Sequence, residues 1–257
     1  MNLESLLKFH FPKTTQLSDS PHGTSPDALS VTDVMASMGM TQSRVALGYS
    51  AFLGKMEISN NDQARALNLL FERAMMLAPQ YPHVWRLGEE QRDRLLRILC
   101  VYAFEDYARS AATKAPCKAC GGDGFIRKVI TRRVYKNGVY VDLEGTEDIL
   151  CKHCKGKGVT SCACRDCKGR GKVLDREASN AAEQPVFKTC TRCGGVGYQR
   201  LKRSIVHKAI CEHVMKVTHF TWWTRYRPLF EELITELDKQ EAAAESAIQA
   251  ITKREDD

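Results

Sequence analysis

The stretch CKACGGDG, residues 117–124, is one of four copies of the pattern Cys-x-x-Cys-x-Gly-x-Gly in the middle of this chain. The others are CKHCKGKG at 151–158, CRDCKGRG at 164–171 and CTRCGGVG at 190–197. Together they hold eight of the eleven cysteines. Each Cys-x-x-Cys turn offers two thiolates, and a structural zinc ion takes four soft ligands in a tetrahedron. The repeats therefore predict two zinc sites rather than disulfides or free thiols.

From the geometry of the chain we expect the four motifs to pair in a nested order. The first motif then pairs with the fourth, and the second with the third. The first predicted site holds Cys117, Cys120, Cys190 and Cys193, and the second holds Cys151, Cys154, Cys164 and Cys167. The cysteine-rich region of DnaJ-type chaperones, which these motifs resemble, pairs its four repeats in the same way. The glycines favour φ > 0, which turns backbone N–H groups toward the sulfurs. Because four thiolates leave no position for water or substrate, both ions are expected to support folding rather than catalysis.

The composition is that of a globular protein. A chain of 257 residues with 43% hydrophobic content suffices for one or two small domains. It opens MNLESLLKFHFPK and contains no apolar run of signal-peptide or membrane-span length. We therefore expect a cytoplasmic protein with reduced, metal-bound cysteines and no membrane partner.

The net charge of +7 is modest, but its distribution is uneven. Between Lys188 and Arg227 there are nine Lys or Arg residues and one acidic residue, Glu212. From Glu231 to Asp257 there are nine acidic residues and three basic ones. This asymmetry predicts a face that binds a polyanion.

The fold is predicted to be mainly α, with four stretches. Residues 1–30 are rich in Ser, Thr, Pro and Gly and form a loop-rich segment. Residues 31–115 form a helical body, 116–197 the inserted zinc-binding region with a β-hairpin, and 198–257 a helix-turn-helix-like unit with a C-terminal helix.

Two long helices are expected in the helical body, the first capped by a residue within 59–62. The apolar positions expected to face the core are Ala64, Leu67, Phe71, Ala74 and Ala78 in the first helix, and Leu95, Ile98, Leu99 and Tyr102 in the second.

The hairpin is predicted at 128–143, where β-branched and charged residues alternate around Asn137-Gly138, a favoured type I′ turn. Its basic residues indicate either contact with nucleic acid or a solvated edge that discourages aggregation. The inner two motifs also carry many cations, which makes a phosphate backbone or RNA a plausible partner. These cations are Lys152, Lys155, Lys157, Arg165, Lys168, Arg170 and Lys172.

Residues 198–240 are predicted to form a helix, a short break over 216–220 and a second helix capped by Thr221. In a helix-turn-helix the first turns of the second helix read base edges in the major groove, and the first helix lies near phosphates. The expected base-reading residues are Thr221, Thr224, Arg225 and Arg227, and the expected phosphate contacts are Arg200, Lys202, Arg203 and Lys208. An ordinary helical hairpin is the alternative.

Two further features bear on this unit. Pro228 must either kink the second helix or lie in the first turn of a new one. A rival helix-turn-helix pattern covers 32–55, where Ala36, Gly39 and Val45 have the order of repressor-type units. Only Arg44 and Lys55 supply charge there, so a packing role is favoured.

The whole chain resembles a family, the late-gene antitermination proteins Q of lambda-like bacteriophages. The resemblance rests on LESLLKFH, LSDSP, TDVMASMGMTQS and DYARSAAT, and on the chain from Cys190 through the TW and RPLFEEL segments. It implies a non-enzymatic protein that binds double-stranded DNA in the late promoter and engages paused, sigma-containing host RNA polymerase. With host NusA, such proteins make the polymerase read through terminators and lie near the nascent RNA.

The resemblance also implies an insertion. Family members of the lambda type carry one pair of Cys-x-x-Cys motifs, corresponding here to the first and fourth. The inner pair, 151–171, is therefore expected to be inserted.

Two other functions remain open from the residues alone. A DnaJ-like zinc-dependent chaperone or thiol-active protein fits the motifs, although the chain has no His-Pro-Asp loop, no Gly/Phe-rich linker and no β-rich domain after the cysteines. A zinc enzyme would need His207, His213 or His219, none of which neighbours a Cys-x-x-Cys left free by the two predicted sites.

Overall fold

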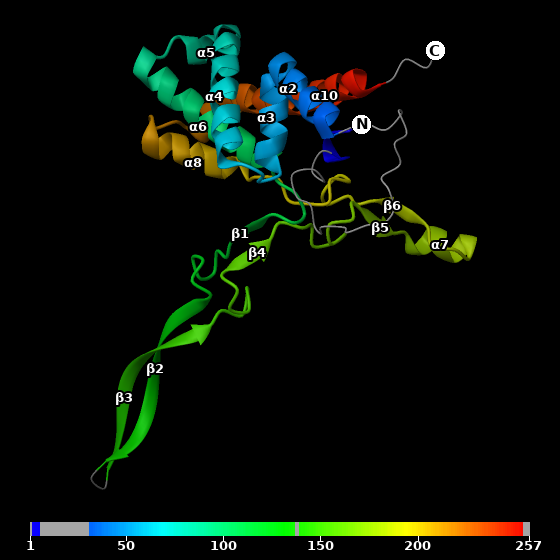
Figure 1. The fold of residues 1–257 in the computed structure, drawn as a ribbon. Helices are drawn as coiled ribbons and strands as arrows, with labels where there is room; N and C mark the ends of the chain where they lie inside the picture. The colour runs from blue at the N-terminus through cyan, green and yellow to red at the C-terminus, as the bar shows by residue number, and fades with distance from the viewer. Residues whose placement is uncertain (1, 6–30, 137–138, 254–257) are drawn as a thin grey trace. The chain divides into compact units, whose positions relative to one another are not determined.

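The computed structural model describes residues 2–5, 31–136 and 139–253 (Figure 1). The chain divides into two compact units: residues up to Ala108 together with those from Leu201 onward, and Arg109–Arg200. The sequence predictions for most of 1–30, for the Asn137-Gly138 turn and for the end of the tail lie outside the described residues.

The first unit is helical, as expected for a mainly α fold. Its elements are α2 (Val31–Arg44), α3 (Ala46–Lys55), α4 (Asn60–Leu77), η1 (Ala78–Gln80), α5 (Pro82–Trp85), α6 (Glu89–Tyr107), α8 (Arg203–His213), α9 (His219–Thr221), the π-helical turn η2 (Trp222–Tyr226) and α10 (Arg227–Thr252).

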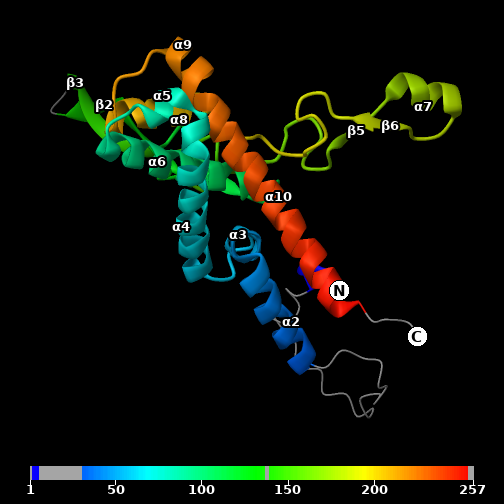
Figure 2. The same cartoon turned by 90° about the horizontal axis from the view of Figure 1, so that it is seen from above.

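Helix α10 is the longest element of this unit and packs along α6, α3 and α2 (Figure 2). Its apolar stripe follows the helical period. Leu229, Leu233 and Leu237 enter the larger core cluster, while Ala244 and Ile248 enter a second cluster with residues of α3. The C-terminal stretch thus completes the core of the helical body, and residues from Leu201 onward belong to the same compact unit as those up to Ala108.

The two predicted helices of the body are present as α4 and α6. Ser59 caps α4, since its side chain accepts a hydrogen bond from Asp62 N. Most of the predicted stripe of α4 faces the core: Ala74 and Ala78 are buried, and the half-buried Leu67 and Phe71 pack against the core. Ala64 is exposed, and the buried face also includes Ala66, Leu70 and Leu77. In α6 the prediction is confirmed: Leu95 and Leu99 are fully buried, and the half-buried Ile98 and Tyr102 pack against the same core.

The rival helix-turn-helix pattern at 32–55 forms α2 and α3, which only Val45 separates. Gly48 of α3 lies so close to α10 that a Cβ placed there would be 1.8 Å from the carbonyl oxygen of Gln240. This segment serves packing, as its low charge indicated.

A buried carboxylate links the segment just before the second unit to the segment just after it. Asp106, near the end of α6, accepts hydrogen bonds from Leu201 N at 2.6 Å and from Arg203 Nη1 at 3.1 Å. Its side chain is fully buried. Because Asp106 precedes the second unit and Leu201 follows it, this contact fixes both ends to the helical unit.

In the part of the second unit that the structure describes, there are three two-stranded antiparallel sheets and one short helix. Its elements are β1 (Lys114–Pro116), β2 (Phe125–Lys136), β3 (Val139–Leu150), β4 (Val159–Ser161), β5 (Lys172–Leu174), α7 (Arg176–Ala182) and β6 (Phe187–Thr189). The pairs are β1 with β4, β2 with β3 and β5 with β6.

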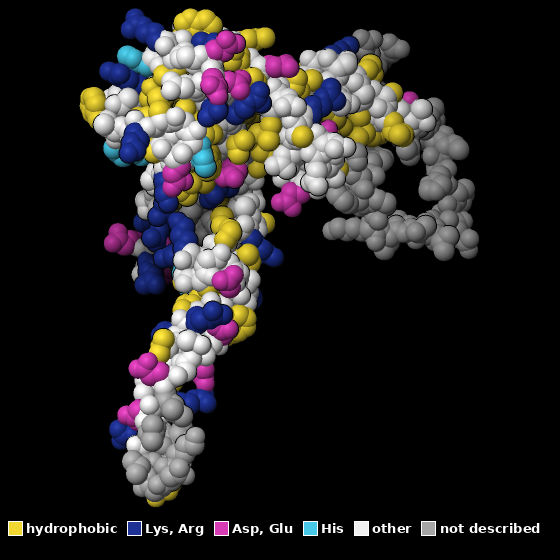
Figure 3. Space-filling model, turned by 90° about the vertical axis from the view of Figure 1, so that its left-hand side faces the viewer, with side chains coloured by type: hydrophobic (Ala, Val, Ile, Leu, Met, Phe, Trp, Pro, Cys, Tyr) yellow, Lys and Arg dark blue, Asp and Glu magenta, His cyan; other side chains and the backbone are white. Residues whose placement is uncertain are grey.

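The predicted hairpin is confirmed as β2 and β3, paired from Phe125↔Leu150 to Lys136↔Val139. Its arginines form cross-strand ion pairs, including Arg127 with Asp148 at 3.2 Å and Arg133 with Asp142 at 2.9 Å. Figure 3 shows Lys and Arg interspersed with Asp and Glu along it. This pairing favours the solvated-edge interpretation over a nucleic-acid surface.

Within the described residues, no helix combines the length and the apolar character needed to cross a membrane.

We predict that Asp106→Ala lowers the free energy of unfolding of the helical unit by about 3–5 kcal/mol, because Arg203 and Leu201 N would lose a buried charged partner. Urea denaturation followed by the helical circular dichroism signal measures this. Glu90→Ala is the control, because its exposed pair with Arg94 stabilises by less than about 0.5 kcal/mol. An equal, small change in both variants would contradict the role of Asp106.

Candidate metal centres and nucleic-acid surface

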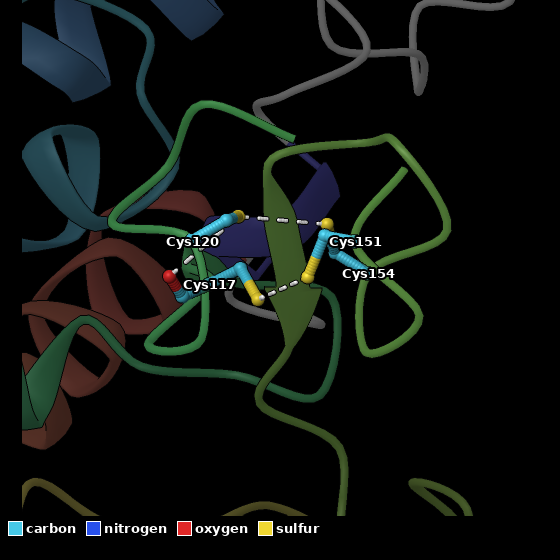
Figure 4. Close-up of side chains that lie close together, drawn as sticks. All are labelled: Cys117, Cys120, Cys151 and Cys154. Atoms are coloured by element: carbon cyan, nitrogen blue, oxygen red, sulfur yellow. Dashed lines mark hydrogen bonds between the residues drawn. The ribbon is translucent and has the colours of Figure 1, made fainter. Parts of the chain in front are cut away.

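The eight motif cysteines form two compact groups, each able to hold one metal ion. The groups are Cys117, Cys120, Cys151 and Cys154 (Figure 4), and Cys164, Cys167, Cys190 and Cys193. The predicted cysteines are therefore the ones brought together, but the predicted nested pairing is wrong. The first motif pairs with the second, and the third pairs with the fourth.

The spacing between sulfurs fits a tetrahedral ion. The Sγ–Sγ distances are 3.9 and 3.8 Å across the first group and 3.8 and 3.7 Å across the second. Four sulfurs at about 2.3 Å from a central zinc would lie about 3.8 Å apart. The cysteines are buried except Cys193, which is half-buried.

Backbone hydrogen bonds lock each pair of motifs independently of the sulfurs. Cys117 N donates to Gly158 O at 2.7 Å, and Cys151 N donates back to Gly124 O at 2.9 Å. In the second group, the N–H of the first cysteine of each motif donates in the same way to the last glycine of its partner, at 2.8 and 2.9 Å. The pairing thus follows from two reciprocal backbone contacts per group.

The last glycine of each motif is required by this close approach. A Cβ on Gly158 would lie 2.1 Å from Gly122 O, and a Cβ on Gly171 would lie 2.1 Å from Gly195 O. Both glycines also have positive φ, +69° and +72°. No other residue type satisfies both conditions without displacing the partner motif.

The strand registers explain why adjacent motifs pair. The hairpin places Phe125 opposite Leu150, so the motif ending at Gly124 meets the motif beginning at Cys151. The pair β5 and β6 does the same for the third and fourth motifs, since Lys172 lies opposite Thr189. The predicted Asn137-Gly138 turn already contained this signal, because a hairpin centred there brings 124 and 151 together.

Backbone N–H groups prepare the sulfurs for metal. The N–H groups of Cys154 and His153 lower the pKa of Cys151 to about 7, and those of Cys167 and Asp166 lower the pKa of Cys164 to about 7. Gly124 N donates to Cys120 Sγ at 3.2 Å, and Gly197 N to Cys193 Sγ at 3.3 Å. Burial acts in the opposite direction on the second cysteine of two motifs, and it raises the pKa of Cys154 and of Cys193 to about 11. Hydrogen bonds to a thiolate favour its charged form, which is the metal-binding form.

The other three cysteines lie outside both groups. Cys100 is buried in the helical core, where burial raises the pKa of its thiol to about 12. The Sγ of Cys162 is 3.9 Å from Arg109 Nη1. Cys211 contacts His207 Nε2 at 3.5 Å and Val217 O at 3.4 Å. His207 is itself bonded to Val217 O, so it serves the turn after α8.

The predicted helix, break and second helix after residue 198 are present as α8, a five-residue connection and the continuous run α9–η2–α10. Thr218, rather than Thr221, caps the second helix: its side chain accepts from Thr221 N at 3.2 Å. Pro228 lies in the first turn of α10, directly after the π-helical turn, which accommodates the residue that cannot donate.

The predicted DNA-contacting residues divide into two sets. Arg203 is held by Asp106 and lies over the Phe230 ring. Arg227 pairs with Glu231 at 2.7 Å and lies 3.6 Å from the centre of the Trp223 ring. Thr221 is half-buried and its hydroxyl is 2.8 Å from that of Thr218. The remaining predicted residues are exposed: Arg200, Lys202, Lys208, Thr224 and Arg225.

An exposed aromatic cluster lies on the same segment and was not predicted. Phe220 is 75% exposed and Trp223 is 52% exposed. His219 stacks on Trp223, and Arg227 covers a face of the same ring. The Trp-Trp pair at the start of the second helix was the sequence signal, because Trp222 is buried while Trp223 is half exposed.

The sequence model of a known family, antitermination protein Q, matches residues 23–111 and 158–245. The chain belongs to this family. A prophage antitermination protein Q homologue of Escherichia coli (strain K12) is 38% identical over 98% of this chain and 100% of its own length. Antitermination protein Q of Salmonella phage P22 and that of Escherichia phage lambda are each 34% identical over the same shares. The function of the chain is therefore transcription antitermination in phage late-gene expression.

The Q-family match leaves out residues 112–157, which overlap the expected insertion, 151–171, only at 151–157. The omitted segment contains all four cysteines of the first metal group and the hairpin between them. The second group lies wholly within the matched residues.

We predict that metal content distinguishes the two pairings. Cys117→Ser combined with Cys151→Ser removes ligands from one group only, so one ion per chain should remain. Cys151→Ser combined with Cys164→Ser damages both groups, so both ions should be lost. Elemental analysis of purified protein measures the ratio, and nested pairing would give the opposite result for each variant.

We predict that Gly158→Ala weakens metal binding by the first group more than tenfold, because the new Cβ displaces Gly122 from its position beside the site. Chelator competition measures the affinity. Gly121→Ala is the matched control: its φ of +67° carries a similar conformational cost of about 1–2 kcal/mol, but no atom lies within 4 Å of the added Cβ. Equal losses would show that the close approach contributes nothing.

Proposed function

We propose that this chain is an antitermination factor that binds double-stranded DNA within a phage late promoter and loads onto sigma-containing, paused host RNA polymerase. With NusA it then makes the polymerase read through terminators, close to the nascent RNA, in the cytoplasm of the host bacterium. The observation that carries this proposal is the similarity to antitermination proteins Q over 98% of the chain.

The exposed surface of α8 and the start of the second helix is the proposed DNA contact. Between His213 and Phe230 the chain has three Lys or Arg residues and no acidic residue. The exposed Thr224 and Arg225 lie on the first turns of the second helix, where a helix-turn-helix places its base-reading residues. Lys202 and Lys208 lie on or beside α8 and supply phosphate contacts.

Arg203 and Arg227 have a positioning role in this proposal. Both are about three-quarters buried and paired with carboxylates that belong to the same unit. Arg203 joins Asp106 of α6 to Glu231 of α10, at 3.1 and 3.7 Å, and Arg227 joins Glu231 to Trp223. They hold the second helix against the body, so that Arg225 projects from a fixed frame.

The two cysteine groups are proposed to hold zinc. All-thiolate ligation, tetrahedral sulfur spacing and N–H donors to the sulfurs are the properties of structural zinc sites. The residues that would hold the ions are those of the two groups, and each bound ion supplies folding energy rather than chemistry. The protein then acts by binding alone and has no catalytic residue.

Single-round transcription tests this function. Host holoenzyme is started on a template with the cognate late promoter followed by a strong terminator, with and without the protein and NusA. Read-through that requires both the protein and that promoter supports the proposal. No read-through with folded, metal-loaded protein would overturn it.

We predict that Arg225→Ala lowers affinity for the promoter DNA by about tenfold and lowers read-through at limiting protein, with metal content unchanged. Electrophoretic mobility shift at several salt concentrations measures the affinity. Arg94→Ala, which removes an exposed arginine of α6 that pairs with Glu90, is the control and should bind as wild type. Equal loss in both variants would indicate a general charge effect instead of recognition by this helix.

A further inference from the structure

Two lysines in the second unit occupy a backbone conformation that favours glycine. The fifth position of every motif has positive φ: Gly121 at +67°, Lys155 at +53°, Lys168 at +51° and Gly194 at +62°. The fold of the motif therefore imposes this conformation. Glycine adopts it without strain, whereas a side chain with a Cβ does not. The first and fourth motifs show that glycine serves the structure, so the two lysines are strained where they need not be.

Neither lysine has a structural role that glycine would lack. Their backbone N–H groups donate to Cys151 O at 2.8 Å and to Cys164 O at 2.7 Å, which any non-proline residue can do. Both side chains are exposed. Among the described residues, neither ammonium group is paired with a carboxylate. Strain that persists without a local benefit indicates a functional use of the side chain.

The chain segment that holds the two lysines is strongly basic. The second and third motifs follow each other closely in the chain, and the segment 151–172 carries seven Lys or Arg residues and one acidic residue. That residue, Asp166, pairs with Arg192 at 2.6 Å. All seven cations are exposed. The contrast with the hairpin is clear, since the hairpin arginines are paired across the strands.

We infer that the second and third motifs form a binding site for the phosphate backbone of a nucleic acid, with Lys155 and Lys168 as its contacts at the two knuckle turns. Each turn is fixed by its cysteine group and by the partner motif, which explains how the strain is tolerated. Exposed lysines that are not paired with carboxylates among the described residues suit the repeating anion of a nucleic-acid backbone, and phosphate contacts carry no base readout. This site is separate from the proposed DNA contact of α8–α10 and does not rest on it.

Binding of the full-length, metal-loaded protein to two probes tests the inference. Fluorescence anisotropy is measured with a single-stranded RNA and with a double-stranded DNA, both of sequence unrelated to any promoter, over a range of salt concentrations. The test variant combines Lys155→Gly with Lys168→Gly. The control combines Arg127→Gln with Arg133→Gln, which removes the same charge from paired hairpin residues of the same unit.

For the glycine variant we expect an affinity loss of at least tenfold at 0.1 M salt for at least one probe. The slope of log affinity against log salt should fall by about 1.4 for single strands or about 1.8 for duplex, as two lost phosphate contacts require. Metal content should stay at the wild-type ratio, and the melting temperature should equal or exceed that of wild type. The probe for which the affinity falls identifies RNA or DNA as the ligand.

Lys155→Gln combined with Lys168→Gln separates charge from strain, because it keeps the side chain at positive φ and removes the charge. This variant should lose as much affinity as the glycine variant without the gain in melting temperature. Wild-type affinity for both probes in either variant would overturn the inference. An equal loss in the hairpin control would also overturn it, whatever the result of the promoter-binding and read-through assays.

Discussion

The close approach of two glycine-rich turns is the constraint on which the second unit depends. Gly158 and Gly122 are so near that one added carbon would lie 2.1 Å from a carbonyl oxygen. The reciprocal bonds between Cys117 and Gly158, and between Cys151 and Gly124, exist only at this distance. One motif alone satisfies neither its backbone nor a metal ion. Each pair is closed by sulfur and by backbone together, and the chain must therefore bring two motifs into antiparallel contact.

The sequence encodes this antiparallel contact in the hairpin between the first two motifs. The predicted nested pairing did not take that hairpin into account. The eight ligands, the hairpin and the helical body were predictable, because they rest on residue spacing and local periodicity. The pairing was not settled by the cysteines, since four identical motifs are chemically interchangeable. It followed from the hairpin register, which sets Phe125 opposite Leu150 and so delivers the first motif to the second. Three-residue strands such as β5 and β6 carry too little pattern to be predicted in the same way.

The arginines of the C-terminal segment show a second limit of sequence reasoning. Arg203, Arg225 and Arg227 look alike in a basic stretch, but only Arg225 is exposed. Arg203 donates a hydrogen bond to Asp106, which lies about a hundred residues earlier in the chain. No local sequence pattern predicts this contact. The stripe of Leu229, Leu233 and Leu237 was visible as a helical period, and it explains why this segment joins the body rather than forming a domain of its own.

Asp106 accepts a hydrogen bond from Leu201 N, so the two ends of the second unit are joined within the helical unit. This contact does not depend on the residues of the second unit. The first metal group is equally self-contained: its ligands and both of its ladders, β1 with β4 and β2 with β3, lie within Lys114–Ser161. The residues outside the family match, 112–157, cover nearly this range. A module with its own metal and its own strand pairs can be gained or lost while the second group and the helical unit keep every contact that stabilises them. The basic second motif lies almost wholly outside the family match, so Lys155 belongs to the segment that the match leaves out, whereas the cationic third motif lies within the match.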